Sequence, residues 1–147
     1  MYTRRLLLPE RSFFLFGPRG TGKTTWLRDL LPDAHWVDLL ADRELVRLLR
    51  EPGLLTREVE ALPARSWVVV DEVQKLPALL NEVQDLLLRR GPRIRFALTG
   101  SSARKLRRSD ANLLAGRAIN RRFFPLTASE LGQDFDLDRA LRFGTLP

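Results

Sequence analysis

Residues 17–24 read GPRGTGKT, with glycine, lysine and threonine at the spacing G-x-x-x-x-G-K-T. The apolar run 12–16 directly precedes them and predicts a buried strand, and residues 25–30 predict a helix. A glycine-rich turn between strand and helix lets successive backbone N–H groups point inward, and the helix N-terminus adds partial positive charge. The pattern therefore predicts a phosphate-binding loop. The alternative is a plain strand-to-helix turn capped by a threonine.

This loop assigns a role to each of its polar side chains. Lys23 would reach the β- and γ-phosphates of a nucleotide, and the hydroxyl of Thr24 would hold Mg²⁺. The predicted binding residues are Gly17, Pro18, Arg19, Gly20, Thr21, Gly22, Lys23, Thr24 and Thr25.

Beyond the loop, strand and helix patterns alternate. The predicted strands are 12–16, 35–38, 67–70, 94–99 and 119–124, and the predicted helices are 25–30, 41–49, 54–62, 76 to the Gly91-Pro92 terminator, 103–106, 112–114 and one from about Thr127. Thr127 and Glu130 have the spacing of a capping box. The alternation predicts an α/β fold, a parallel sheet with helices on both faces and a ligand at the carboxyl ends of its strands.

The segment before the first strand has two interpretations. Leu6, Leu7 and Leu8 are most simply a short helix packed on the sheet. In related folds, however, a segment at this position often borders the adenine, which would bring Tyr2 and residues 4–9 to the nucleotide.

Two adjacent acids follow the valine-rich third strand. Asp71 would hold Mg²⁺ directly or through a bound water, and Glu72 would orient and polarise an attacking water. Adjacent acids at a buried strand end are costly unless a cation or waters serve them. The alternative is that they cap the next helix.

After the fourth strand, Ser101 could bond the γ-phosphate or the water. Thr99 and Ser102 compete for that role, and a simple turn with capping hydroxyls is the alternative.

Composition narrows the class of protein. The 147 residues suffice for one α/β domain, and the absence of cysteine excludes disulfides and cysteine nucleophiles. His35 is the single histidine, so a zinc site is not expected. The N-terminal apolar run is too short for a signal peptide, and none approaches a membrane span, which predicts a cytoplasmic protein with no membrane partner.

The net charge is +7, from 25 basic and 18 acidic residues. Such a balance suits nucleic-acid binding, and two dense clusters lie at 89–95 and 104–108. Arginine on solvated helix faces is the alternative, and no aromatic residues interleave with these clusters as a stacking platform would need.

Four motifs together resemble a family of prokaryotic AAA+ ATPases, from about residue 2 to the end of the sequence. They are residues 17–25 (GPRGTGKTT), 70–75 (VDEVQK), 98–102 (LTGSS) and 114–117 (LAGR), in the order that the family has them. The resemblance implies a P-loop ATPase with an additional strand in its sheet, sheet order 5-1-4-3-2, ATP or ADP as ligand and Mg²⁺ as cofactor. It also implies Glu72 as the hydrolytic glutamate and Ser101 as the sensor on the fourth strand.

Arg117 resembles the arginine finger of that family, which acts in trans on the γ-phosphate of a neighbouring subunit and so implies a homo-oligomer. A surface arginine or a helix-capping cation is the alternative, and Arg121 and Arg122 are near enough to compete.

Members of the family continue through a helical lid and a C-terminal domain. The resemblance therefore implies an ATPase domain over 1–131 and a truncated C-terminal region over 132–147, with hydrolysis in doubt and phosphate binding retained.

The leading functional hypothesis is Mg²⁺-dependent ATP hydrolysis. One alternative is a nucleotide-gated adaptor that binds nucleic acid or protein without efficient turnover. The other is a small P-loop kinase, which the Asp71–Glu72 pair disfavours because kinases keep water from the γ-phosphate.

Overall fold

Five segments pair as parallel strands in the order β2-β3-β4-β1-β5. In the computed structural model, which describes residues 2–107 and 114–147, they are β1 (Phe13–Phe16), β2 (His35–Asp38), β3 (Ser66–Asp71), β4 (Ile94–Gly100) and β5 (Ile119–Arg122). Read from the other edge, this is the expected order 5-1-4-3-2. The predicted α/β fold is therefore confirmed.

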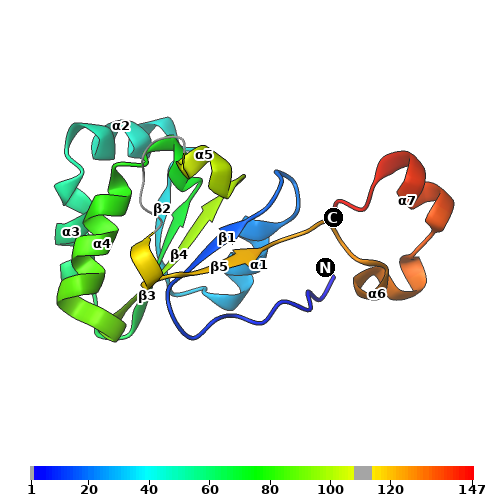
Figure 1. Ribbon diagram of the computed structural model, residues 1–147, viewed down its shortest axis with the longest axis horizontal. Coiled ribbons are helices and arrows are strands. Elements are labelled where there is room, and N and C mark those ends of the chain that lie inside the picture. The colour runs from blue at the N-terminus through cyan, green and yellow to red at the C-terminus, as the bar shows by residue number, and fades with distance from the viewer. Residues whose placement is uncertain (1, 108–113) are drawn as a thin grey trace.

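Helices cover both faces of the sheet, and one face carries more of them (Figure 1). The helices are α1 (Lys23–Leu30), α2 (Asp42–Arg50), α3 (Gly53–Glu60), α4 (Leu79–Arg90), α5 (Ala103–Arg107), α6 (Ala128–Leu131) and α7 (Leu137–Phe143). Short 3₁₀ turns are η1 (Val73–Lys75), η2 (Gly91–Arg93), η3 (Leu114–Gly116) and η4 (Gly132–Asp134). Within the described residues, no helix has the length and apolar character that crossing a membrane requires.

Alternation along the central strand β1 divides the core into two clusters. Phe14 and Phe16 pack with residues of α2, α3 and α4, whereas Phe13 and Leu15 pack with Trp26 and neighbouring residues of α1. Successive strand residues point to opposite faces, so a strand covered on both sides must be apolar throughout. All four residues of β1 are buried accordingly.

Parallel pairing brings the carboxyl ends of β1, β3 and β4 to one edge of the sheet. Phe16 is in register with Gly100, and the N–H of Gly17 donates to the Gly100 carbonyl at 3.2 Å. A Cβ atom on Gly17 would lie 2.0 Å from the Phe123 carbonyl oxygen, so only glycine fits where the loop leaves β1. Every strand-end motif predicted to bind nucleotide or metal therefore reaches this edge.

The expectation of a helix at Leu6–Leu8 was wrong, because these residues form neither helix nor strand. Leu6 and Leu8 pack against the core beside α1, whereas Leu7 between them is 84% exposed. Such an in–out–in pattern has the two-residue period of an extended chain.

Most of the other expected elements form close to their predicted bounds. The helix expected from residue 76 begins later, at Leu79, after η1 and three further residues. The capping box at Thr127 and Glu130 is confirmed. Of the helix expected at 112–114, residues 112 and 113 lie outside the described residues, and Leu114 opens η3.

A buried ion pair ties the N-terminal segment to the helices after β5. The Arg4 guanidinium lies 3.2 Å from the Glu130 carboxylate, stacks over the Phe123 ring at 4.0 Å and donates to the Phe124 carbonyl at 2.5 Å. It also donates to the Thr21 carbonyl at 3.0 Å. The two termini lie near each other, between the sheet and the segment that carries α6 and α7 (Figure 1).

Glu130 makes the stability of the fold depend on pH. Burial by itself would raise the pKa of Glu130, but the backbone N–H groups of Thr127 and Arg5 and the charge of Arg4 outweigh burial and lower that pKa below its usual 4.5. A depressed carboxyl pKa contributes stability above the unfolded-state value and loses it as pH falls through the folded-state value.

We therefore expect the free energy of unfolding of the wild type to fall more steeply below about pH 4.5 than that of Glu130→Gln, as measured by urea denaturation at pH 7, 5, 4 and 3. Glu10→Gln, at an exposed carboxyl without an ion pair among the described residues, is the control. Parallel curves for wild type and Glu130→Gln would contradict this account.

Candidate functional site

The loop between β1 and α1 has the backbone that an anion-binding turn requires. Gly20 and Gly22 have φ values of +78° and +87°, a region that residues with a Cβ rarely adopt. Thr21 bonds back to the Pro18 carbonyl at 2.9 Å. Gly22 is the N-cap of α1, and no side chain caps the helix there. The first N–H groups of α1 are thus free to meet an anion.

Lys23 is buried inside this loop. Its ammonium donates to the carbonyls of Gly17 at 2.7 Å and Pro18 at 2.9 Å, and the residue is only 5% exposed. Burial lowers the pKa of Lys23 from its ordinary value, and the nearby charges of Glu72 and Asp71 oppose that shift. The loop therefore has a positive charge at its centre, and the two hydrogen bonds from that charge to the loop carbonyls fix its conformation.

The carboxylate of Asp71 joins three elements. It accepts a hydrogen bond from the Thr24 hydroxyl of α1 at 2.8 Å and another from the Thr99 hydroxyl of β4. Asp71 is 3% exposed and Thr99 is fully buried. The predicted metal ligands Thr24 and Asp71 are thus in direct contact, although they are 47 residues apart in sequence.

Glu72 follows in a left-handed backbone conformation, with φ of 60° and ψ of 49°. Its N–H donates to the Thr99 hydroxyl at 2.9 Å, and its carboxylate accepts from the amide nitrogen of Gln74. No described lysine or arginine forms an ion pair with Asp71 or Glu72. The two buried carboxylates thus have hydroxyl and amide hydrogen-bond donors but no ion-pair partner. Such a pair of carboxylates suits an added cation.

The three hydroxyls that competed for the sensor role differ in their partners. Thr99 is engaged by Asp71 and Glu72, and Ser102 accepts from the N–H of Arg104 at 3.1 Å. The hydroxyl oxygen of Ser101 is buried and has no partner among the described residues. Ser101 is therefore the hydroxyl that is free to bond an incoming group.

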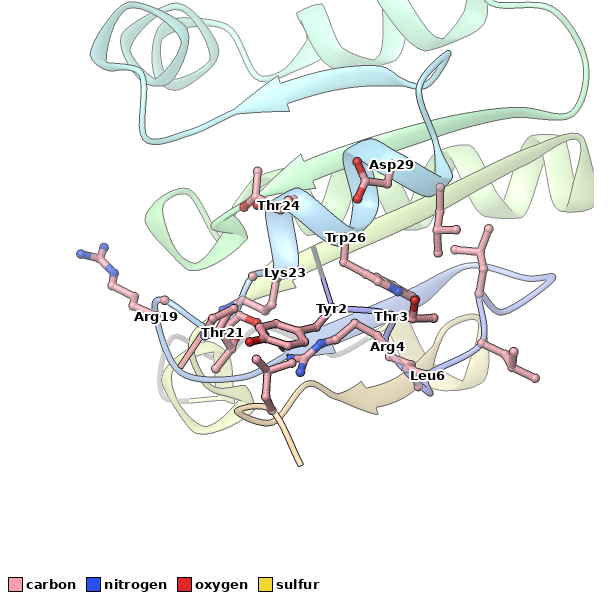
Figure 2. A pocket seen from close by; sticks show the side chains of 18 of the residues that line it. Tyr2, Thr3, Arg4, Leu6, Arg19, Thr21, Lys23, Thr24, Trp26 and Asp29 are labelled. Atoms are coloured by element: carbon pink, nitrogen blue, oxygen red, sulfur yellow. Dashed lines mark hydrogen bonds between the residues drawn. The ribbon is translucent and has the colours of Figure 1, made fainter. Parts of the chain in front are cut away.

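A cavity of about 870 Å³ adjoins the loop. Figure 2 shows Lys23, Thr21 and Thr24 on one side of it, and Tyr2, Arg4 and Leu6 of the N-terminal segment on another. Trp26, Asp29 and Thr25 of α1 also line it, as does Pro147. The segment before β1 thus borders the predicted phosphate loop.

Two predicted arginines differ in their distance from this centre, since Arg19 lies at the rim of the cavity and Arg117 lies outside it. Arg19 is exposed, and its side chain extends outward from the loop in Figure 2. Arg117 precedes β5, so it lies where the strands begin, whereas Lys23 lies where they end. It adjoins a second cavity of about 450 Å³ that Arg11 and Arg95 also line. Within one chain, Arg117 therefore cannot reach the phosphate loop.

Thr99 carries the hydrogen bonds that hold both acids in place. Thr99→Val keeps the shape of the side chain. It leaves the Glu72 N–H without its acceptor and one Asp71 oxygen without its donor. We expect a loss of about 2–4 kcal/mol in the free energy of unfolding, since a buried polar group left unpaired costs about 1–3 kcal/mol. Urea denaturation measures it, with the exposed Thr3→Val as control; equal losses in the two variants would refute the network's importance.

Comparisons with known proteins relate the chain to solved structures and to one protein family. A search of curated proteins found no match. The structure of Cdc6p from Pyrobaculum aerophilum matches with a TM-score of 0.53 and 25% identity, over 89% of this chain and 43% of that one. PCH-2 from C. elegans matches with a TM-score of 0.48 and 20% identity, over 80% of this chain and 36% of that one.

The chain therefore spans less than half the length of these two solved structures. The model of a family described as an AAA domain matches residues 9–132, which is most of the chain. The chain belongs to this AAA domain family and is a nucleotide-binding P-loop domain of the ATPase type.

Proposed function

We propose that this domain binds ATP with Mg²⁺ and hydrolyses it to ADP and inorganic phosphate. The observation that carries the proposal is the chain of hydrogen bonds from Thr24 to Asp71 to Thr99, beside the buried ammonium of Lys23. It brings a cation, a hydroxyl and two carboxylates from three separate segments to one edge of the sheet. Phosphoryl transfer requires little more than such positioning and charge stabilisation.

The loop would hold the triphosphate through its backbone N–H groups, and Lys23 would exchange its carbonyl partners for β- and γ-phosphate oxygens. The positive φ values of Gly20 and Gly22 support this role because they turn the backbone around the anion without a Cβ in the way. Arg19 and Thr25, at the rim, would contact the phosphates from outside.

The donor set at Thr24 and Asp71 fits Mg²⁺, which prefers one or two carboxylates together with phosphate oxygens and waters. No cluster of three His, Asp or Glu side chains occurs in residues 2–107 and 114–147, so phosphate and water would complete the coordination. When bound, Mg²⁺ would neutralise charge on the phosphates.

Hydrolysis then follows from Glu72 and Ser101. Glu72 would take a proton from a water whose oxygen bonds to the γ-phosphorus, while the bond from that phosphorus to the β–γ bridging oxygen breaks. The unpartnered hydroxyl of Ser101 would donate to the γ-phosphate. The base and ribose would occupy the cavity beside Tyr2, Leu6 and Trp26, which is far larger than a phosphate needs.

Two variants separate binding from turnover. Lys23→Ala removes the buried charge, and we expect the Kd for Mg·ATP to rise by about 10- to 100-fold or more, as one or two charge-assisted hydrogen bonds would imply. Glu72→Gln keeps the shape but not the base, so binding should persist while kcat falls by about 10²- to 10⁴-fold. Calorimetry and phosphate release measure the two effects.

The exposed neighbour Lys75→Ala is the control for lost charge. A wild-type kcat in Glu72→Gln would rule out Glu72 as base. Binding without turnover in the wild type would favour the nucleotide-gated adaptor, and turnover only with an added acceptor would favour the kinase. Nucleic-acid binding and a cytoplasmic location remain predictions.

Arg117 can act only on another subunit, because it lies at the far edge of its own sheet. We expect Arg117→Ala to lose about 10³-fold or more in kcat, within the range of arginine fingers supplied in trans. Mixing it with Lys23→Ala should restore part of the activity, because a subunit with an intact loop then meets an intact arginine. Arg121→Ala tests the competing arginine, and Arg43→Ala, at an exposed position on α2, is the control. A mixture no more active than its components would contradict action in trans.

A further inference from the structure

One side chain that the motifs did not single out holds the carboxylate of Glu72. The amide nitrogen of Gln74 donates to that carboxylate, and Gln74 belongs to η1, the turn that directly follows. The left-handed conformation of Glu72 makes the chain turn sharply after β3. Residues 72 and 74 are thereby paired at the strand end, where the Thr99 hydroxyl fixes the Glu72 backbone.

The other end of the same amide has no partner. The side-chain carbonyl oxygen of Gln74 is buried and accepts no hydrogen bond from any described residue, and the hydroxyl of Ser101 is in the same condition. Buried polar atoms are nearly always paired in native proteins, so each exception calls for a functional explanation. Among the described residues, three buried side-chain atoms are without a partner. Those of Gln74 and Ser101 belong to the candidate site, and the third, the Nε of Arg95, lines the second cavity beside Arg117.

Gly100 leaves the space that this amide occupies. A Cβ atom on Gly100 would lie 3.0 Å from the Gln74 carbonyl oxygen and 3.4 Å from the ring of Phe16. The backbone of Gly100 is not in the left-handed region, so its conformation does not require glycine. Glycine at position 100 therefore matters because it leaves room for the side-chain amide of Gln74.

We propose that Gln74 is a positioning residue for hydrolysis: its amide nitrogen holds the Glu72 carboxylate, and its carbonyl oxygen accepts a hydrogen bond from the attacking water. The inference rests on the proposed function. A water placed there gives one hydrogen to Glu72 and the other to Gln74, and a lone pair on its oxygen stays free for the γ-phosphorus. Gln74 exchanges no proton, and Glu72 receives the one that the water loses.

Methionine at position 74 tests this role, because it keeps the length of glutamine and removes both polar ends. We expect Gln74→Met to lower kcat by about tenfold or more, as the loss of a hydrogen bond to a charged group implies. KM and the Kd for Mg·ATP should stay within about twofold of wild type. Gln74→Glu keeps an acceptor but cannot donate and repels Glu72, so it should be at least as slow.

Two further variants exclude a packing effect. Gly100→Ala displaces the amide without altering Gln74 itself, and it should reproduce the loss in kcat with unchanged nucleotide affinity. Gln84→Met makes the same substitution on α4, outside the site, and should retain the wild-type kcat. Thermal unfolding of each variant confirms that the fold is intact.

A readout without turnover uses the ¹⁵N-labelled protein free of nucleotide. The side-chain amide protons of Gln74 should exchange slowly with water, and their NMR signals should shift in Glu72→Ala, because they donate to that carboxylate. Signals that Glu72→Ala leaves unchanged would overturn the inference.

A wild-type kcat in Gln74→Met would overturn this inference alone. A wild-type protein that binds Mg·ATP without hydrolysing it would overturn the proposed hydrolysis and this inference together.

Discussion

The carboxylate of Asp71 is the point on which the candidate site depends. It is buried at the end of β3 and accepts hydroxyl donors from α1 and from β4, so it ties the first helix to two strands of the sheet. Because a buried charge without partners is costly, these hydroxyls must stay where they are for the strand end to remain folded. The same requirement places Thr24, and with it the start of α1, against the carboxyl edge.

The sheet provides this arrangement through its order. β1 lies between β4 and β5, and β3 pairs with the other side of β4, so three strand ends converge although long crossovers separate them. The helices of those crossovers bury the two faces, and the polar groups are left at the edge. Stability and site geometry therefore come from the same topology, with the apolar residues inside and the chemistry at the strand ends.

Local patterns were enough to predict most elements and the residues of the loop. The strand–loop–helix at 12–30 has strong signals within a few residues, and so does the capping box at Thr127. The sheet order came with the family resemblance, which the match over residues 9–132 supports. The contact of Thr24 with Asp71 fits that order, since Asp71 ends β3 and Thr24 lies in the first turn of α1, after the loop that leaves β1.

What the sequence could not provide were contacts between side chains from distant segments. Nothing near Arg4 indicates its partner Glu130, which is 126 residues away. The bond from Thr99 to Asp71 likewise depends on the register of two strands. Gln74 lies within the motif at 70–75, but nothing in that motif indicates that its amide holds the Glu72 carboxylate. The three leucines at 6–8 do not form a helix, because the first and third of them pack against the core and the middle one does not.

The hydrogen bonds from Lys23 to the Gly17 and Pro18 carbonyls have a kinetic consequence. The ammonium fixes the conformation of the loop before any ligand arrives. The conformational entropy of the loop is therefore lost during folding and not when a ligand binds. Preorganised sites associate rapidly, because the arriving molecule does not wait for a rearrangement. In the proposed binding step, an anion would displace these two neutral carbonyl oxygens from the ammonium.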